Sequence, residues 1–460
     1  MTERSFATPR LVEAIGMILV LLGLFRVYML FNSNGYLPPP FVFDVGDTFM
    51  DWYNTAYWAH NPGAYSVWRT IYLPLSFVIT GLLGDSSCYN SHPYDARACD
   101  TFGIYVILAT YLGCVIVTAL AFYRRDRATA LFRTVAIAVG GPLLFALERG
   151  NLIMMAFMAF VMLFGGLLKS SRGFALAAGL AANLKVYMIF PIAALAIKRE
   201  WRLLELCGIS ALAIYIVTLG IVGAGTPVEF IDNLQNWFSV RLTTIWDELL
   251  YTTTYRVFLE IDVNQYPVRD YLEEKYVEYF KYFVQYYLIS SRGVALLCIG
   301  LAWLYPKTIS ITRLVFFLLM QSFVVQNPGG YSIAIIVFLV FMERWRNFGT
   351  GLAIVCAYLM SVPGDVPIAK IIDVIRESWL SGRVVLSEYV LPAGALIRPG
   401  LIAIMLWALA IDSLIDFHRA AKAGRPSFPL VPSWKGTAGV RFTPAPQIAA
   451  RASDGGATQL

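Results

Sequence analysis

The hydrophobic residues of this chain fall in long continuous runs that are separated by short polar segments. Runs of about 20 apolar residues, the length with which a helix crosses a bilayer, recur along most of the sequence, starting with 11–31 behind the basic segment MTERSFATPR. We expect this first helix to stay uncleaved, because no small-residue cleavage site follows it. The approximate predicted spans are 11–31, 102–122, 131–148, 151–168, 173–184, 186–198, 201–222, 287–305, 309–325, 330–342, 347–361 and 396–416. The pattern predicts an all-α polytopic membrane protein with about twelve transmembrane helices.

Basic residues in the short loops set the expected orientation, because Lys and Arg concentrate on the cytoplasmic side of membrane proteins. The basic segments are YRRDR at 123–127, KSSR at 169–172, KREWR at 198–202, Lys307, ERWRN at 343–347 and the tail segment HRAAKAGR. Placing them all inside puts both termini in the cytoplasm and leaves outside the segments 32–101, 223–286, VVQNPGGYS and 362–395. Within these outer segments we expect 71–84 to be re-entrant or interfacial and AKIIDVIRESWLSGRVV to form an amphipathic surface helix.

Composition agrees with a membrane protein and narrows the class of function. The chain is 58% hydrophobic and only 14% charged, whereas soluble proteins average about 25% charged residues. The formal net charge of +6 does not indicate nucleic-acid binding, since the basic residues lie in the loops and the tail. The sequence contains no P-loop, GxSxG, HExxH or metal-type Cys/His cluster, which argues against a nucleotide-driven pump or a kinase.

The cysteines and the C-terminal segment add two expectations. Four of the six cysteines lie inside apolar runs, where they are expected to pack as small hydrophobic residues. Cys88 and Cys99 lie in the polar segment GDSSCYNSHPYDARACD, where they either form a disulfide in an oxidising compartment or remain free thiols. From about Ala420, proline, glycine and small residues replace the apolar runs, so we divide the chain into a membrane domain, 1–419, and a disordered cytoplasmic tail, 420–460.

Acidic residues follow the first predicted span, in the segment FDVGDTFMDWY at 43–53. Charge beside a membrane span is costly and therefore marks a candidate functional site. Asp47 and Asp51 are four residues apart and would share one face of a helix. Desolvation by the surrounding aromatic residues would strengthen a carboxylate there as a base. The alternative is that these acids, with Asp44, cap a helix and contact solvent.

Two groups of polar residues interrupt later apolar runs. In GGPLLFALERGNLIMM, Glu148, Arg149 and Asn151 lie at a nearly loopless junction between two spans. They form either a structural ion pair or a phosphate site in which Arg149 acts at a helix N-terminus. Lys185 interrupts a stretch rich in small residues, and a buried ammonium needs an anionic partner, either a protein carboxylate or a ligand phosphate.

A lipid-linked phosphosugar would suit all three groups, with its chain in the membrane, its phosphate at the cations and its sugar near the acids. At these residues the sequence resembles the integral-membrane glycosyltransferases of the GT-C type. The most similar family contains the polyprenyl-phosphate-mannose-dependent α-mannosyltransferases of mycobacterial phosphatidylinositol mannoside synthesis. The resemblance covers roughly 10–350 and rests on DTFMDWYNTAYWAHNPGAYSVWRTIYLPLSF, ERGNLIMM and AAGLAANLKVYMIFPIAALAIKREWR. The chain departs from it at Arg149-Gly150, where many relatives have Gly-Gln, and at Tyr72-Leu73-Pro74, where they have Tyr-Pro-Pro.

The resemblance implies a GT-C-like bundle and an inverting transfer of a mannose-like hexose from a polyprenyl-phosphate sugar to a lipid or glycan acceptor outside the cytoplasm. It also implies that one Asp of the first outer loop is the base. The spacing to Gly63-Ala64-Tyr65 favours Asp47 in this role, with Asp51 as a second carboxylate and Asp44 as a structural residue. The other candidates are Arg149, Lys185, Arg69 and Arg292 for the donor phosphate, Glu148, Asn151 and Tyr72 as supporting residues, and Trp237 and Trp246 for the acceptor groove.

We expect no tightly bound cofactor. Metal dependence is left open, because two nearby acids could hold a divalent ion although no further ligand cluster is evident. The expected protein is a monomer in the plasma membrane that contacts membrane lipids and no nucleic acid. The rival interpretations are a transporter or flippase of lipid-linked sugars, which the very short cytoplasmic loops disfavour, and a ligase or polymerase of lipid-linked oligosaccharides.

Overall fold

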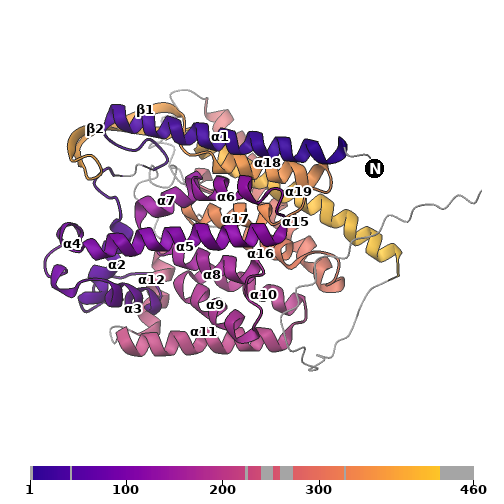
Figure 1. Ribbon diagram of the computed structural model, residues 1–460, viewed down its shortest axis with the longest axis horizontal. Coiled ribbons are helices and arrows are strands. Elements are labelled where there is room, and N and C mark those ends of the chain that lie inside the picture. Colours follow the sequence, from indigo (N-terminus) through magenta and orange to yellow (C-terminus); the bar gives the residue numbers. More distant parts are fainter. Residues whose placement is uncertain are drawn as a thin grey trace, which may run out of the picture.

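The computed structural model describes residues 4–41, 44–222, 226–239, 252–259, 273–325 and 328–424, and most of its regular structure is helical (Figure 1). The longest helices are α1 (Arg4–Asn34), α5 (Thr101–Arg125), α11 (Trp201–Val222), α15 (Glu274–Leu304) and α19 (Gly394–Lys422). The shorter helices are α2 (Met50–His60), α3 (Pro74–Leu83), α4 (Pro93–Cys99), α6 (Ala130–Ala138), α7 (Gly141–Arg149), α8 (Ile153–Phe164), α9 (Ser171–Leu184), α10 (Ile189–Ile197), α12 (Pro227–Ser239), α16 (Ile311–Val325), α17 (Ile333–Phe341) and α18 (Phe348–Ser361). The remaining elements are the 3₁₀ turns η1 (Ser86–Cys88), η2 (Val186–Met188), η3 (Tyr255–Leu259) and η4 (Gly330–Ser332), and the strands β1 (Pro367–Ser378) and β2 (Arg383–Pro392).

Helices of membrane-spanning length confirm the predicted class of protein. Within the described residues, six helical segments are long and apolar enough to cross a membrane, namely Pro9–Asn34, Thr101–Arg125, Ala130–Arg149, Trp201–Val222, Glu274–Leu304 and Gly394–Lys422. The other six predicted spans coincide with helices that are shorter than the about 20 residues needed to cross alone. The structure therefore supports a helical, membrane-embedded protein, and the prediction of twelve crossings is not confirmed.

Short helices fill the interior of the bundle, and long helices flank it. All nine residues of α17 are buried, whereas α1 and α11 expose leucine and isoleucine side chains along much of their length. Figure 1 shows α1 and α11 on opposite flanks, with α5 and α8 between them. Apolar outer faces on long helices suit contact with lipid, because a helix satisfies its own backbone hydrogen bonds there.

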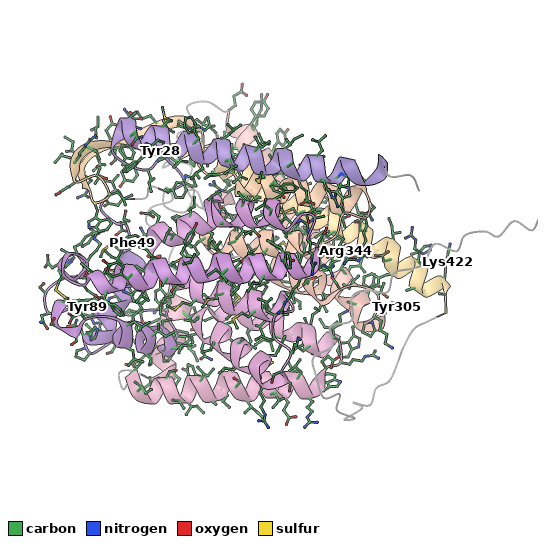
Figure 2. The ribbon with its side chains drawn as sticks, viewed as in Figure 1. Tyr28, Phe49, Tyr89, Tyr305, Arg344 and Lys422 are labelled. Carbon is green, nitrogen blue, oxygen red and sulfur yellow. A yellow bond between two sulfur atoms is a disulfide. The ribbon has the colours of Figure 1, made fainter. Side chains whose placement is uncertain are left out.

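The two ends of the bundle differ in their charged residues. The helix α5 is about 37 Å long at 1.5 Å per residue, which exceeds the about 30 Å of a bilayer's hydrocarbon core. At its C-terminal end the basic loops interlock, since Arg125 Nε donates to the Met342 carbonyl at 2.8 Å and Arg124 donates to the Gly166 carbonyl at 3.2 Å. Figure 2 shows Arg344 and Lys422 toward this end, and Phe49 and Tyr89 at the opposite end.

One predicted helix is divided in the structure, and the predicted start of another is wrong. The predicted span 131–148 is divided into α6 and α7 at Gly140, where a Cβ atom would lie 2.1 Å from the Ala136 carbonyl oxygen. Pro142 then lies in the first turn of α7, where a residue that lacks an N–H is tolerated. The helix α15 begins at Glu274 rather than near 287, so the sequence EKYVEYFKYFVQYY belongs to this helix and not to an outer loop.

The prediction of an amphipathic helix within 362–395 is also wrong. This segment forms an antiparallel hairpin of β1 and β2, in which Ile375 lies opposite Leu386. Its isoleucine and valine residues favour strands because branched side chains pack well on a pleated surface. Gly382, with φ 63°, takes the left-handed conformation in the turn between the strands. In its described residues the protein is therefore mostly helical with one two-stranded sheet, rather than all-α.

The apolar segment 71–84, predicted to be re-entrant or interfacial, contains α3. This helix of 10 residues begins at Pro74 and packs on protein, against α2 and α11.

The C-terminal tail was expected to start at 420, but α19 continues to Lys422. Residues 425–460 of that predicted tail lie outside the described part of the chain.

Candidate functional site

Arg149, the last residue of α7, joins two of the acids that follow the first helix. Its Nη1 lies 2.5 Å from Asp47 Oδ2, and its Nη2 lies 2.9 Å from Asp51 Oδ1. The side chains of all three residues are 13–19% exposed. Charge-assisted hydrogen bonds are strong where water is largely excluded. Two groups that the sequence presented separately therefore form one structural unit, which we call the acid clamp (Asp47, Asp51 and Arg149).

Asn151 completes the contacts of Asp51. Its Nδ2 donates to Asp51 Oδ2 at 2.6 Å, and its Oδ1 accepts a hydrogen bond at 2.8 Å from the backbone N–H of Ile153. Since that second bond satisfies a free N–H at the start of α8, the side chain of Asn151 is fixed at both ends. Both oxygens of Asp51 are thus engaged, one by Arg149 and one by Asn151.

The backbone around Gly150 explains how α7 presents Arg149 to the acids. Gly150 ends α7 with φ 61°, a conformation that glycine adopts without a steric penalty. A Cβ atom there would lie 3.1 Å from the Phe49 carbonyl oxygen. The Phe49 N–H also donates to the Glu148 carbonyl at 2.7 Å. The end of α7 and the start of α2 are therefore in direct backbone contact, which requires a residue without a side chain.

Glu148 and Asp44 have supporting positions. Glu148 is buried, and its Oε1 accepts a hydrogen bond from Thr48 Oγ1 at 2.9 Å. Asp44 Oδ1 accepts from the Gly46 N–H at 2.9 Å, and its other oxygen lies 3.9 Å from Arg376 Nε on the surface. Asp44 is thus outside the acid clamp, and the structural role expected for it stays a prediction.

Cys88 and Cys99 form a disulfide, which decides between the two alternatives left by the sequence. The segment between them makes two contacts, not predicted from the sequence, to residues 44–49, which we call the acid loop. Tyr94 Oη donates to Asp47 Oδ1 at 3.0 Å. Arg97 Nη1 donates to the carbonyls of Gly46 and Thr48 at 2.7 and 2.5 Å. The sequence feature that could have indicated these contacts is the presence of an aromatic residue, Tyr94, and a basic residue, Arg97, between the two cysteines.

Burial keeps the Tyr94 hydroxyl in its donating form. Partial burial, together with the carboxylate of Asp47, raises the pKa of Tyr94 to about 12. The hydroxyl therefore stays protonated around neutral pH and donates its hydrogen bond to Asp47. Asp47 thus accepts one bond from a cation, Arg149, and one from a neutral hydroxyl.

The turn of the β1–β2 hairpin covers the acid loop from a third side. The Trp379 ring makes an edge contact with Phe49 at a centroid distance of 5.4 Å, and the Arg97 guanidinium lies 4.9 Å from the Trp379 centroid. The backbone N–H of Trp379 donates to the Val45 carbonyl at 3.3 Å.

Lys185 lies between α9 and η2, beside the acid clamp. Its ammonium lies 4.9 Å from the ring centroid of Tyr72 and 5.5 Å from that of Tyr331, and such ring faces attract a cation. Among the described residues, the ammonium of Lys185 has no hydrogen bond and no ion pair. Burial lowers the pKa of Lys185 to about 8, and the carboxylate of Asp51 opposes that shift. Lys185 is thus a desolvated cation with unused hydrogen-bond donors.

Tyr72 lies between Lys185 and the acid clamp. Burial raises the pKa of Tyr72 well above its ordinary range, and the carboxylate of Asp51 adds to the shift. Its hydroxyl therefore remains protonated around neutral pH. The supporting role that the sequence predicted for Tyr72 stays a prediction.

The remaining candidates are not brought to the acid clamp. Arg69 is exposed with φ 48°, and Arg292 is exposed on α15. Neither has a hydrogen bond or ion pair to the acid clamp within the described residues. Trp246 lies outside the described part of the chain, and Trp237 is described only as a backbone position in α12.

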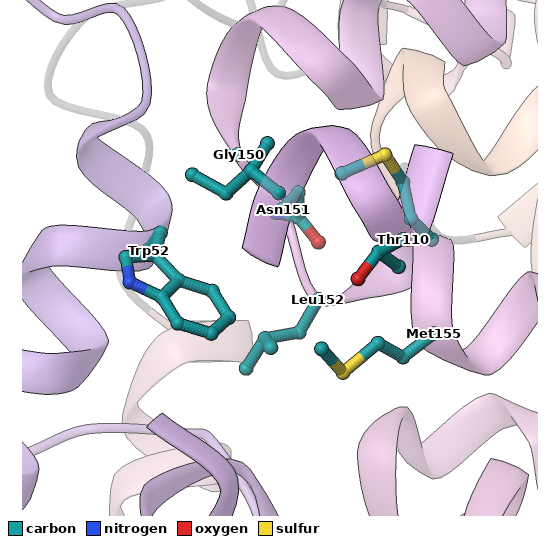
Figure 3. A pocket seen from close by; sticks show the side chains of 8 residues that line it. Trp52, Thr110, Gly150, Asn151, Leu152 and Met155 are labelled. Carbon is teal, nitrogen blue, oxygen red and sulfur yellow. The ribbon is translucent and has the colours of Figure 1, made fainter. Parts of the chain in front are cut away.

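A small crevice borders the acid clamp on its apolar side. Its lining residues include Trp52, Thr110, Asn151 and Met155 (Figure 3), and they leave no room for a water molecule between them. The residues that the structure describes contain no group of three or more His, Cys, Asp or Glu side chains that could hold a metal ion.

Comparisons with known proteins leave the chain without an assigned family. No family model, no curated protein and no solved structure matches it.

Proposed function

We propose that this protein is a membrane glycosyltransferase that transfers a mannose-like hexose from a polyprenyl-phosphate sugar to a lipid or glycan acceptor. In this proposal the configuration at C1 inverts and Asp47 is the general base. The observation that carries the proposal is the acid clamp, which gathers two carboxylates at the end of the bundle opposite the basic loops. The ammonium of Lys185 lies beside it, above two tyrosine rings.

The proposed reaction needs one base and one anion site. The acceptor hydroxyl gives its proton to Asp47, and its oxygen attacks the anomeric carbon of the donor sugar. The bond from that carbon to the phosphate oxygen breaks, and polyprenyl phosphate leaves with the electron pair. A positioned base contributes about 10²–10⁴-fold to the rate, and a phosphate leaving group needs no separate general acid.

The contacts of the two cations support different roles for them. Arg149 was expected to bind the donor phosphate, but it already bonds two carboxylates. We therefore assign it to the orientation of Asp47 and Asp51. Lys185 has no such partner among the described residues, and we assign the phosphate to it. A cation held where negative charge develops lowers the barrier, because the site is already arranged for that charge.

Orientation and location follow from charge distribution. The positive-inside rule assigns the basic loops to the cytoplasm, so the acid clamp would face the opposite side of the plasma membrane. The donor's polyprenyl chain would then lie in the bilayer beside the apolar outer helices, and the short helices would complete the about twelve crossings of a GT-C-like bundle.

The test is a transfer assay with separate readouts for binding and for product. Purified protein in detergent would be incubated with radiolabelled polyprenyl-phosphate sugars and a membrane lipid extract. The proposal predicts label in a new glycolipid or glycan. Donor binding without any labelled product would contradict it and would favour a transporter of lipid-linked sugars.

A further inference from the structure

The two oxygens of Asp47 have different partners. Oδ2 accepts from the Arg149 guanidinium at 2.5 Å, and Oδ1 accepts from the Tyr94 hydroxyl at 3.0 Å. Arg149 is held by Asp51 as well, whereas within the described residues the Tyr94 hydroxyl has Asp47 as its only hydrogen-bond partner. The Asp47 side chain is 15% exposed, and Tyr94 is 42% exposed. Tyr94 therefore covers the Oδ1 side of a nearly buried carboxylate.

A general base must lie within hydrogen-bond reach of the proton that it removes, about 2.6–3.2 Å between heavy atoms. The bond from Arg149 to Oδ2 is charge-assisted on both sides and is the stronger of the two. The bond from Tyr94 to Oδ1 comes from a neutral donor. An incoming hydroxyl would thus replace Tyr94 at lower cost than it would replace Arg149.

We propose that the nucleophilic hydroxyl of the acceptor binds Asp47 Oδ1 in the position that the Tyr94 hydroxyl occupies, so that Tyr94 is a gate that must turn away before transfer. This inference rests on the proposed function. It assigns a binding position for the acceptor and a role for a residue that does not itself accept a proton. The hydroxyl of Tyr94 returns to Oδ1 when the product leaves.

The backbone that carries Tyr94 is fixed, so the gate is the side chain alone. The Cys88–Cys99 disulfide ties the ends of the segment, and Arg97 holds it to the carbonyls of the acid loop. Asp100, at the end of α4, accepts a hydrogen bond from Tyr89 at 2.6 Å. Rotation of an exposed side chain takes picoseconds to nanoseconds, which is fast enough not to limit a typical enzymatic turnover.

The surroundings of Tyr94 leave its ring free to turn toward solvent. The ring stacks on His92 with a centroid distance of 5.4 Å and an interplanar angle of 12°, and both residues are exposed. The Arg97 guanidinium lies 5.4 Å from the Tyr94 centroid, but its hydrogen bonds go to the acid loop. The hydroxyl bond to Asp47 is therefore the specific contact that closes the gate.

The substitution Tyr94→Phe tests the gate, because it keeps the ring and removes only the competing hydroxyl. We expect the acceptor KM to fall about tenfold, which is what loss of one hydrogen bond to a charged group corresponds to. The kcat and the donor KM should stay within twofold of wild type. Tyr105→Phe is the matched control, because Tyr105 is exposed on α5 and has no hydrogen bond to the acid clamp among the described residues.

A rise in the acceptor KM of Tyr94→Phe would show that Tyr94 helps to bind the acceptor and would overturn the gate. An acceptor KM within twofold of wild type would overturn it too. Tyr94→Ala should also lower the acceptor KM. If the acceptor KM falls in Tyr94→Phe but rises in Tyr94→Ala, the ring of Tyr94 helps to bind the acceptor. In that case only the hydroxyl of Tyr94 acts as the gate.

A second readout separates this inference from the proposed function. A water-soluble carbodiimide with glycine amide modifies accessible carboxylates, and peptide mass spectrometry would follow the rate at Asp47. The gate predicts faster modification of Asp47 in Tyr94→Phe than in wild type or Tyr105→Phe. Equal rates would overturn the gate even if transfer occurs. Faster modification in a protein that transfers no sugar would instead overturn the proposed function, and the acceptor assignment with it.

Discussion

Arg149 Nη1 lies 2.5 Å from Asp47 Oδ2, although the two residues are 102 positions apart in the chain. Because Arg149 also bonds Asp51, the acids are held in a fixed relation to each other and their negative charge is partly offset. The proposed base, Asp47, is thus oriented by Arg149 at the end of α7. Arg149 itself does not contact the substrate in the proposed reaction.

Replacing Arg149 with Lys should lower the transfer rate about 100-fold. A lysine is a single flexible charge that cannot bridge both carboxylates as a guanidinium does, and a displacement of about 1 Å at a reacting group costs about 10²-fold. Initial rates of transfer measure the effect. The control is Arg376→Lys, at an exposed residue 3.9 Å from Asp44, which should leave the rate unchanged. A wild-type rate in Arg149→Lys would refute the orienting role.

Sequence reasoning recovered the components of this site but not how they connect. The acids, Arg149 and Lys185 were visible as charges beside apolar runs, because such charges are costly and rare. No local rule pairs Asp47 with a residue 102 positions away, so Arg149 was assigned to a ligand phosphate. Tyr94 was missed for the same reason, since only the fold brings α4 onto the acid loop.

The sequence predicted the long membrane helices of the fold, but not its β-hairpin or the helix break at Gly140. Long apolar runs identify membrane helices directly, and 201–222 has the predicted bounds. The hairpin of β1 and β2 was misread because a short segment of mixed isoleucine, valine and charged residues fits both a helix face and a strand. The break at Gly140 was missed because hydrophobicity continues through it, while the Gly-Gly-Pro sequence interrupts the helical backbone.

The donor KM should depend on pH through Lys185. Its pKa is lowered to about 8 by burial, so the ammonium loses its proton as the pH rises through about 8 and the donor KM should rise above that pH. The neighbouring Tyr72 does not titrate in this range, because its own pKa is raised. In Lys185→Arg the cation stays charged, so the rise should disappear. The same pH dependence in both proteins would contradict the assignment of the phosphate to Lys185.

The buried pair of Glu13 and Arg133 should stabilise the fold without affecting transfer. Arg133 bonds both oxygens of Glu13, at 2.8 and 2.7 Å, and the two side chains are 0–2% exposed. Glu13→Gln leaves a buried guanidinium without its counter-charge, so it should lower the free energy of unfolding by about 3–5 kcal/mol. Thermal unfolding in detergent measures the change, and the transfer rate at 25 °C should not move.

The control for that stability measurement is Asp416→Asn, which removes a surface pair at 3.8 Å from Arg419. Exposed pairs contribute about 0–1 kcal/mol, so its unfolding temperature should stay near that of wild type. Equal effects of Glu13→Gln and Asp416→Asn would show that the buried pair contributes no more than a surface pair.

The expected orientation can be tested with single cysteines in intact cells. Ser66 and Arg127 are exposed at opposite ends of the bundle, and the native cysteines give little background because they are either disulfide-bonded or buried. A membrane-impermeant maleimide should label Ser66→Cys and not Arg127→Cys. Labelling of Arg127→Cys alone would invert the orientation and remove the acid clamp from the extracytoplasmic face.

The comparison of Asp47→Asn with Asp44→Asn tests the central claim most directly. Both changes remove one carboxylate from the same loop, but only Asp47 belongs to the acid clamp. With radiolabelled polyprenyl-phosphate sugar, Asp47→Asn should lose about 10²–10⁴-fold of the transfer rate and keep its donor binding, while Asp44→Asn should retain most of its activity. Wild-type transfer in both Asp47→Asn and Asp51→Asn would contradict the assignment of the base.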